Sequence, residues 1–210
     1  MYQKNMNNYF LWIIVSFSLS SMSIAADELV AMKGPHLIVD LRYATTDNFL
    51  HHDVYREFGL DQCYVDPQLK TKIDSISDDL KKHHVKLVFF DCFRPLSVQQ
   101  AMWKLVPDSR YVANPKNGSN HNRGVAIDVT LADEQGQQLK MPTEFDDFTE
   151  KAASTYPCAE DQQQACDNRA LLKSLLTKAG LINIRTEWWH FELPNAKSYP
   201  IRTMPDAQPK

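Results

Sequence analysis

The feature that most constrains this fold is a short strand whose two faces carry different chemistry. In residues 125–131, four apolar side chains alternate with Ala126, Asp128 and Thr130. This period of two predicts a strand with one face in the core. The opposite face presents Asp128 beside the small Ala126, which leaves room for a bulky group. Gly124 permits a tight entry from the preceding loop, and that loop carries His121.

A second polar motif, residues 187–190 (EWWH), follows much later in the chain. A catalytic zinc ion keeps three protein ligands and an open position for water, and His121, Asp128 and His190 can supply such a set. Spacing alone favours neither a metal site nor ordinary structural roles. Glu187 is the candidate general base, because hydrolysis needs a group that carries a proton from water to the leaving amine. Residues three apart on a regular strand point to opposite faces, so a twist, a bulge or the end of the strand must bring Glu187 and His190 together.

Arg94 is a further candidate, because it follows the most apolar segment. Residues 85–90 (VKLVFF) predict a buried strand, and Pro95 begins the next predicted helix. A guanidinium at this junction could stabilise the oxyanion that forms at an attacked carbonyl. The alternative is that Arg94 merely pairs with a surface acid.

The remaining patterns predict helices and strands around these residues. One helix is expected from Asp66, a capping residue followed by proline, to about residue 82. Another is expected from Asp167 to a stop at Gly180. Further strands are expected at residues 37–43, 181–184 and 187–192, the last two as a hairpin, and a return strand at residues 138–141.

At 210 residues the chain suits one domain with a substantial core. Residues 1–26 are of a different kind: one basic residue, an apolar run and small residues at the end form the pattern of a secretory signal peptide. The apolar run at residues 11–19 is short for a membrane span, which needs about 20 residues; an uncleaved anchor is the alternative. We therefore expect a signal peptide at 1–26, a domain at 27–193 and a loosely ordered tail at 194–210, with export to the periplasm and no stable membrane insertion after cleavage.

Charge and cysteine content agree with an exported protein. The formal charge of −3 becomes −4 once Lys4 is removed, so no basic surface points to nucleic acid or anionic lipid. An oxidising compartment permits disulfides among Cys63, Cys92, Cys158 and Cys166. Three pairings are possible. Cys158 with Cys166 is preferred, because the two flank a short polar loop, and this choice leaves Cys63 with Cys92.

The combined motifs resemble a known family. The pattern Ser-x-His-x-x-Gly-x-Ala-x-Asp at residues 119–128, followed by Glu-Trp-Trp-His at 187–190, is similar to the VanX-type D-alanyl-D-alanine dipeptidases. Their wider zinc peptidase family includes D,D-carboxypeptidases. Residues 39–49, 93–95 and 145–148 resemble further segments of the family, so the resemblance covers about residues 37–191. One departure is Cys92-Phe93, where the family often has glycine and an aromatic residue.

The resemblance implies an α+β fold, in which helices pack around a central antiparallel sheet and zinc lies in a cleft on that sheet. It implies one zinc ion per chain, bound by His121, Asp128 and His190. It also implies that Glu187 acts as general base and acid, and that Arg94 stabilises the transition state.

The same resemblance implies a small substrate pocket. Tyr43, Ser119 and Asp146 match positions that line it, with Asp146 a candidate partner for the ammonium group of a dipeptide. The expected reaction is hydrolysis of the small D,D-dipeptide D-Ala-D-Ala to two D-alanines. One alternative is a D,D-carboxypeptidase or endopeptidase that acts on peptidoglycan stem peptides. Another is a non-catalytic binding module with a structural zinc, although the presence of both Glu187 and Arg94 favours an enzyme.

Overall fold

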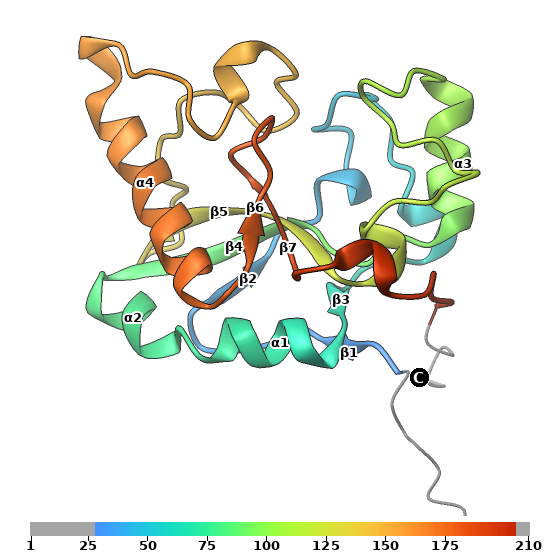
Figure 1. The fold of residues 1–210 in the computed structure, drawn as a ribbon, viewed down its shortest axis with the longest axis horizontal. Coiled ribbons are helices and arrows are strands. Elements are labelled where there is room, and N and C mark those ends of the chain that lie inside the picture. The colour runs from blue at the N-terminus through green and yellow to red at the C-terminus, as the bar shows by residue number, and fades with distance from the viewer. Residues whose placement is uncertain (1–27, 205–210) are drawn as a thin grey trace, which may run out of the picture.

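A computed structural model describes residues 28–204. The expected signal peptide at residues 1–26 and the end of the expected tail lie outside the described residues. The centre of the fold is a five-stranded sheet in the order β2-β4-β5-β7-β6 (Figure 1). Its strands are β2 (Leu37–Val39), β4 (Val85–Asp91), β5 (Ala126–Asp133), β7 (His190–Glu192) and β6 (Ile182–Asn183).

The pairing within this sheet is antiparallel except at one edge. Strand β2 runs parallel to β4, and β4–β5, β5–β7 and β6–β7 are antiparallel. A separate two-stranded sheet joins β1 (Val30–Ala31) to β3 (Tyr64–Val65). The predicted α+β class is therefore confirmed, with one parallel pair in an otherwise antiparallel sheet.

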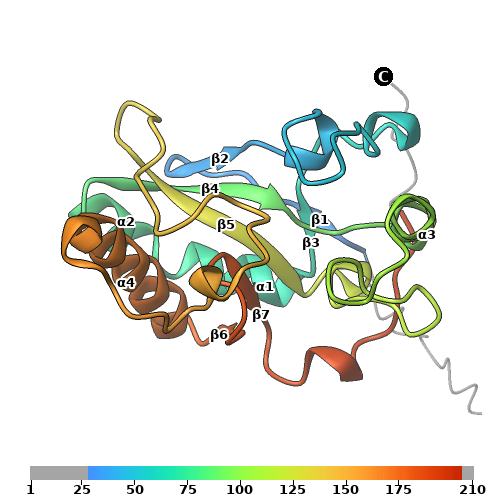
Figure 2. The ribbon, with the colours of Figure 1, turned by 90° about the horizontal axis from the view of Figure 1, so that it is seen from above.

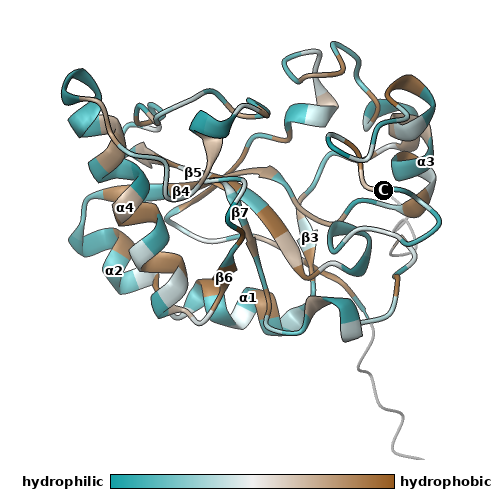
Figure 3. Cartoon of the chain, turned by 45° about the horizontal axis from the view of Figure 1, so that its top comes forward, coloured by the Kyte–Doolittle hydropathy of each residue, from teal (hydrophilic) through white to brown (hydrophobic). Residues whose placement is uncertain are grey.

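Three of the four described helices cover one face of the sheet, as Figure 2 shows. They are α1 (Pro67–Asp74), α2 (Ser77–Lys82) and α4 (Gln163–Lys178). The main core contains their apolar side chains, together with Leu87, Val129 and Leu131 from the strands. The apolar face predicted for residues 125–131 is thus confirmed, and Figure 3 shows apolar stretches along β4 and β5 beneath hydrophilic loops. The fourth helix, α3 (Leu96–Leu105), lies at one end of the sheet (Figure 1).

Several predicted elements are shorter in the structure than in the prediction. The helix expected from residue 66 to 82 is two helices, because it is interrupted at Ser75, whose hydroxyl donates to the Lys72 carbonyl at 2.6 Å. The strand expected at residues 37–43 ends at Val39. Residues 138–141 form only an isolated bridge, between Gln138 and Ala132.

The cysteines pair as preferred, Cys158 with Cys166 and Cys63 with Cys92. Among residues 28–204, none of the helices combines the length and the apolar character that crossing a membrane requires.

The expectation of a loosely ordered tail is wrong for residues 194–204. Arg202 forms an ion pair with Asp66 at 2.7 Å, and its backbone N–H donates to the Asn122 carbonyl at 2.9 Å. Ala196 is buried. Proline and polar residues misled the prediction, because this segment is held by hydrogen bonds and not by a periodic apolar face.

Candidate active site

All eight residues singled out from the sequence line one cavity. Its volume is about 200 Å³, below the roughly 300–1,000 Å³ typical of sites for drug-sized ligands, so it suits a small ligand. It lies on the polar face of β5, where β4 ends and β7 begins. The eight residues are Tyr43, Arg94, Ser119, His121, Asp128, Asp146, Glu187 and His190.

Three of these residues form a compact group that could hold a metal ion. Asp128 and His190 are directly opposite one another on β5 and β7, so their side chains lie side by side. His121 belongs to a 3-10 turn (His121–Arg123) just before β5. Asp128 Oδ1 lies 3.0 Å from His190 Nδ1 and 3.5 Å from His121 Nε2, and the two nitrogens are 3.2 Å apart. Ligand atoms of a tetrahedral zinc ion with bonds of about 2.0–2.1 Å lie about 3.3 Å apart, so the spacing fits.

In each imidazole, the ring nitrogen that faces away from Asp128 donates a hydrogen bond to another residue. His121 Nδ1 donates to the Cys92 carbonyl at 2.9 Å, and His190 Nε2 donates to the Glu192 carboxylate at 3.1 Å. The inner nitrogens, His121 Nε2 and His190 Nδ1, therefore direct lone pairs at each other and at Asp128. This is the arrangement that orients histidines toward a metal, and only a proton or a cation between them relieves the repulsion.

The charges of the group also favour a cation. Burial lowers the pKa of His190, but hydrogen bonds to Asp128 and Glu192 outweigh this effect and raise the pKa to about 10. Burial likewise opposes ionisation of Asp128, yet the two imidazoles hold its pKa far below the usual range. The site thus retains positive charge strongly, and the residues present fit a divalent metal ion.

Glu187 reaches the same cavity because it does not belong to a strand. The strand expected at residues 187–192 begins only at His190, so the alternation of a regular strand does not apply to Glu187. Asn183 holds this bend, since its amide donates to the carbonyls of Glu187 at 3.0 Å and His190 at 2.8 Å. Burial raises the pKa of Glu187 above its ordinary value, which suits a group that both accepts and donates a proton.

Trp188 anchors the same bend. Its backbone N–H donates to the Ala152 carbonyl at 2.9 Å, and its indole N–H donates to the Thr143 hydroxyl at 2.9 Å. The neighbouring Trp189 is buried. The two tryptophans therefore hold the backbone that directly follows Glu187.

Arg94 is fixed in the cavity wall by a buried acid. Asp91, which is fully buried, accepts hydrogen bonds from the Arg94 guanidinium and from the Tyr55 hydroxyl. Gln99 accepts a further bond from Arg94 at 2.9 Å. Burial lowers the pKa of Arg94, but the charge of Asp91 outweighs it and raises the pKa well above the ordinary value. The partner of Arg94 is thus an interior carboxylate and not the surface acid of the alternative interpretation.

The remaining predicted residues, Tyr43, Ser119 and Asp146, line the same cavity. The Tyr43 hydroxyl donates to the Asp146 carboxylate at 3.2 Å, and the Arg94 guanidinium carbon lies 5.0 Å from the centre of the Tyr43 ring. Burial and the nearby charge of Asp128 raise the pKa of Asp146 well above its ordinary value. The Ser119 hydroxyl accepts from the His121 backbone N–H at 3.3 Å.

Several functional neighbours were missed from the sequence. Asp91 was placed only after a predicted strand and Glu192 only within one, although an acid three positions before an arginine, or two positions after a histidine on a strand, signals a partner for that side chain. Tyr111 and Phe148 also line the cavity, with ring centres 5.0 Å apart. They lie on segments without periodicity, so no pattern of apolar and polar residues marked them, and Phe148 was noted only as part of the segment 145–148 that resembles the family.

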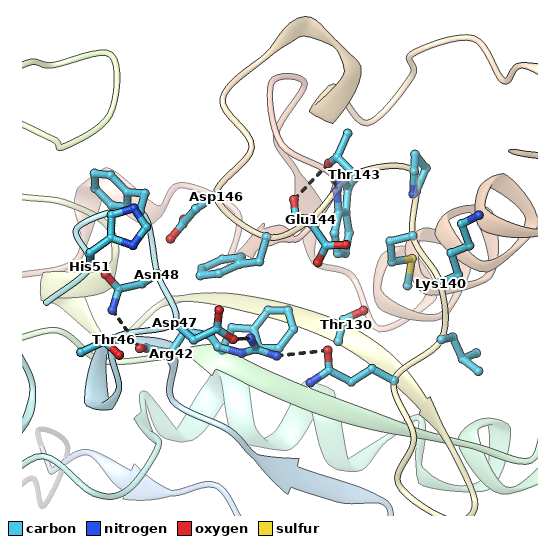
Figure 4. Close-up of a pocket in the computed structure, with 18 residues that line it drawn as sticks. Arg42, Thr46, Asp47, Asn48, His51, Thr130, Lys140, Thr143, Glu144 and Asp146 are labelled. Carbon is cyan, nitrogen blue, oxygen red and sulfur yellow. Dashed lines mark hydrogen bonds and ion pairs between the residues drawn. The ribbon is translucent and has the colours of Figure 1, made fainter. Parts of the chain in front are cut away.

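A second and larger cavity of about 580 Å³ lies beside the first, and Asp146 lines both. Figure 4 shows Asp146 and Glu144 on the loop above this cavity and Arg42 and Thr130 at its floor. Lys140 also lines it. The group that could hold a metal ion lies only in the smaller cavity, which is therefore the candidate active site.

Comparisons with known proteins agree with the geometry. A family model for M15 peptidases, described as D-ala-D-ala dipeptidase, matches residues 27–208. A D-alanyl-D-alanine dipeptidase of Escherichia coli (strain K12) is 36% identical over 167 residues, which are 80% of this chain and 84% of that protein. A protein of the same name from Enterococcus faecalis (strain ATCC 700802 / V583) is 26% identical over 178 residues, 73% of this chain and 84% of that protein. A third, from Synechocystis, is 26% identical over 144 residues, 50% of this chain and 58% of that protein.

Proposed function

Since this chain belongs to the D-ala-D-ala dipeptidase family of M15 metallopeptidases, we propose that it is an exported zinc dipeptidase that hydrolyses D-Ala-D-Ala to two D-alanines. The observation that carries the proposal is the convergence of His121, Asp128 and His190 at 3.0–3.5 Å, in the cavity that Glu187 and Arg94 also line. The alternative of a non-catalytic module with a structural zinc has no support, because the chain is a member of an enzyme family.

The chain's own residues divide the work of hydrolysis. A zinc ion bound by His121, Asp128 and His190 would act as a Lewis acid and would lower the pKa of a bound water to about 7. Glu187 takes a proton from the attacking water and returns it to the leaving amine. Arg94, held in one orientation by Asp91, stabilises the negative charge that develops on the oxygen of the attacked carbonyl.

The other lining residues suit a free dipeptide, which carries a charge at each end. Asp146 is the carboxylate available to the substrate ammonium, and the Tyr43 hydroxyl orients it. The small volume of the cavity supports a substrate of two small residues.

Export to the periplasm is part of the proposal. The signal-peptide pattern at residues 1–26 supports it. Two disulfides also support it, because such bonds persist mainly in oxidising compartments. Cell fractionation of the full-length chain tests it; retention in the cytosol with an intact N-terminus would contradict export.

One observation favours a second candidate, a D,D-carboxypeptidase or endopeptidase acting on peptidoglycan stem peptides. The larger cavity shares Asp146 with the catalytic one, so a peptide extended at its amino end would find space on the far side of that residue. In this case the substrate offers an amide and not an ammonium group to Asp146.

The deciding experiment combines metal analysis with a substrate panel. Chain lacking residues 1–26 is assayed with D-Ala-D-Ala, L-Ala-L-Ala and a stem pentapeptide that ends in D-Ala-D-Ala. We expect one zinc ion per chain and turnover of D-Ala-D-Ala far above the other two. Faster turnover of the pentapeptide would establish the second candidate. A zinc-loaded protein that cleaves none of the three would overturn the proposed function.

A further inference from the structure

We propose that the Cys63–Cys92 disulfide is a positioning element of the metal centre. It fixes the backbone carbonyl that orients His121, so the site reaches full metal affinity only after this pair is oxidised. The inference goes beyond the proposed function and rests on it only for the choice of zinc. Both cysteines are buried, with exposed fractions of 1%.

His121 is fixed at two points, its imidazole ring and its backbone carbonyl. The Cys92 carbonyl accepts the imidazole Nδ1–H at 2.9 Å, and the backbone N–H of Arg94 donates to the His121 carbonyl at 3.1 Å. One short segment, residues 92–94, therefore fixes both the ring and the backbone of this residue. Because the Nδ1 bond sets which nitrogen faces the metal, the position of the Cys92 carbonyl controls the aim of Nε2.

The segment of residues 92–94 is held by its bonds to residues 63 and 64. Residues 92–94 come after the last residue of β4 and have no strand partner in the central sheet. Phe93 N–H donates to the Tyr64 carbonyl at 2.8 Å, and the disulfide binds Cys92 to Cys63, the residue before β3. Strand β3 belongs to the separate two-stranded sheet. The disulfide is thus the covalent link between that sheet and the segment that orients His121.

The Cys158–Cys166 disulfide differs from Cys63–Cys92 because its surroundings do not line the cavity. Cys158 and Cys166 are eight residues apart and lie at the start of α4. No described residue between 149 and 183 lines the catalytic cavity. The guanidinium of Arg169, which contacts both sulfurs at 3.6 and 3.9 Å, is also outside it. Neither of its cysteines lines the cavity or belongs to the residue pairs that hold His121, so this bond is a matched control within the chain.

Formation of the Cys63–Cys92 disulfide requires an oxidant. Oxidation of the two thiols removes two electrons and two protons, which pass by exchange to the disulfide of a thiol–disulfide oxidoreductase. In the reduced chain, no covalent bond supports the segment that carries the Cys92 carbonyl, whereas Asp128 and His190 are paired across the sheet. The reduced chain is therefore expected to fold with a loosened His121 and to bind metal weakly, which would restrict hydrolysis to an oxidising compartment.

The test compares two double variants of the mature chain, Cys63→Ser/Cys92→Ser and Cys158→Ser/Cys166→Ser. The zinc dissociation constant is measured by competition with a chromophoric chelator, well below the unfolding temperature of each variant. The visible spectrum of the cobalt-substituted protein reports the ligand geometry. We expect zinc binding about 10- to 100-fold weaker in the first variant, as is typical when the outer partner of a metal-bound histidine is disturbed, and an altered cobalt spectrum. The second variant should bind zinc within about twofold of the unmodified chain.

A redox experiment covers the case in which the first variant fails to fold. The Cys158→Ser/Cys166→Ser protein, which keeps a single disulfide, is reduced, freed of reductant and metal, and titrated with zinc before and after reoxidation. Weak binding that reoxidation restores supports the proposal. Unchanged zinc affinity in a folded protein without the Cys63–Cys92 bond would overturn it. Loss of the whole fold in both preparations would overturn it as well, because the bond would then support the domain in general and not the metal centre.

Discussion

The two sides of the catalytic cavity are built in different ways. On the metal side, Asp128 and His190 lie on paired strands and are at most 8% exposed. On the substrate side, Tyr43 belongs to a 3-10 turn (Arg42–Ala44), and Asp146 lies in an irregular segment with a left-handed φ of 60°. Strands hold the geometry that the chemistry requires, whereas loops can change to suit another substrate without disturbing it. The comparison predicts that variants on the metal side abolish the reaction and variants on the substrate side weaken binding.

The largest effect is expected from His121→Ala. This substitution removes a ligand that is fixed both at its ring and at its backbone. The protein should lose zinc on dialysis and hydrolyse D-Ala-D-Ala below the limit of detection. Metal analysis and a D-alanine release assay measure both losses. His52→Ala, at an exposed histidine, is the control and should change neither; zinc retained at one ion per chain in His121→Ala would refute the ligand assignment.

Glu187→Ala should separate catalysis from metal binding. The carboxylate is a proton carrier and not one of the three grouped ligands, so zinc content should survive. Loss of general acid–base catalysis typically costs about 10²- to 10⁴-fold in rate, and kcat should fall by that amount. Glu150→Ala changes an exposed carboxylate outside the cavity and serves as the control. Unchanged turnover in Glu187→Ala would show that another group carries the proton.

Asp91→Asn tests the support behind the metal side. The substitution leaves the buried Arg94 without its charged partner, and breaking a buried ion pair in this way costs about 3–5 kcal/mol. Urea unfolding should show a fall in the free energy of unfolding of that order, together with reduced kcat. The pair of Asp79 with Lys178 at the surface provides the matched comparison, since Asp79→Asn should lower the free energy of unfolding far less, because ion pairs at the surface contribute little to stability. Equal stability of the two variants would contradict the role given to Asp91.

Asp146→Asn should affect substrate binding more than the chemical step. A hydrogen bond to a charged group contributes about 1.5–3 kcal/mol, so KM for D-Ala-D-Ala should rise about 10- to 100-fold while zinc content stays the same. A fall in kcat with unchanged KM would place Asp146 on the metal side of the comparison instead.

The same residue predicts a pH dependence. Burial and the charge of Asp128 raise the pKa of Asp146, so its carboxyl binds a proton at a higher pH than an ordinary aspartate does. Only the ionised form attracts an ammonium group, and KM should therefore rise as the pH falls through this raised pKa. The KM of Asp146→Asn, which has no such proton, should lack this rise.

The two sides also differ in how far sequence could predict them. Alternation in residues 125–131 and the turn at Gly124 marked Asp128 and His121 directly, because a buried strand follows a periodic rule. Tyr43, Ser119 and Asp146 came only from the resemblance to a family, since loops have no comparable rule. The roles of all these residues stay predictions, although the structure brings them into one cavity.

The errors of prediction have a common physical cause. Glu187 was assigned to a strand, yet Trp188 holds its segment as a bend through hydrogen bonds to the Ala152 carbonyl and the Thr143 hydroxyl. Residues 194–204 were expected to be loose, yet Arg202 pairs with Asp66. Such contacts join residues far apart in the chain, and no local pattern of apolar and polar residues predicts them.

The pairing of β5 with β7 has a consequence for the time at which the protein acquires its metal. The two ligands that it unites, Asp128 and His190, are 62 residues apart, and His121 is 69 residues from His190. Contacts between such distant residues form late, because a long loop must close before they contribute. In the export that we propose, a chain that has delivered His121 and Asp128 across the membrane still offers only part of a metal centre. Metal capture is then the final event of maturation, and the partly folded chain competes poorly for metal ions.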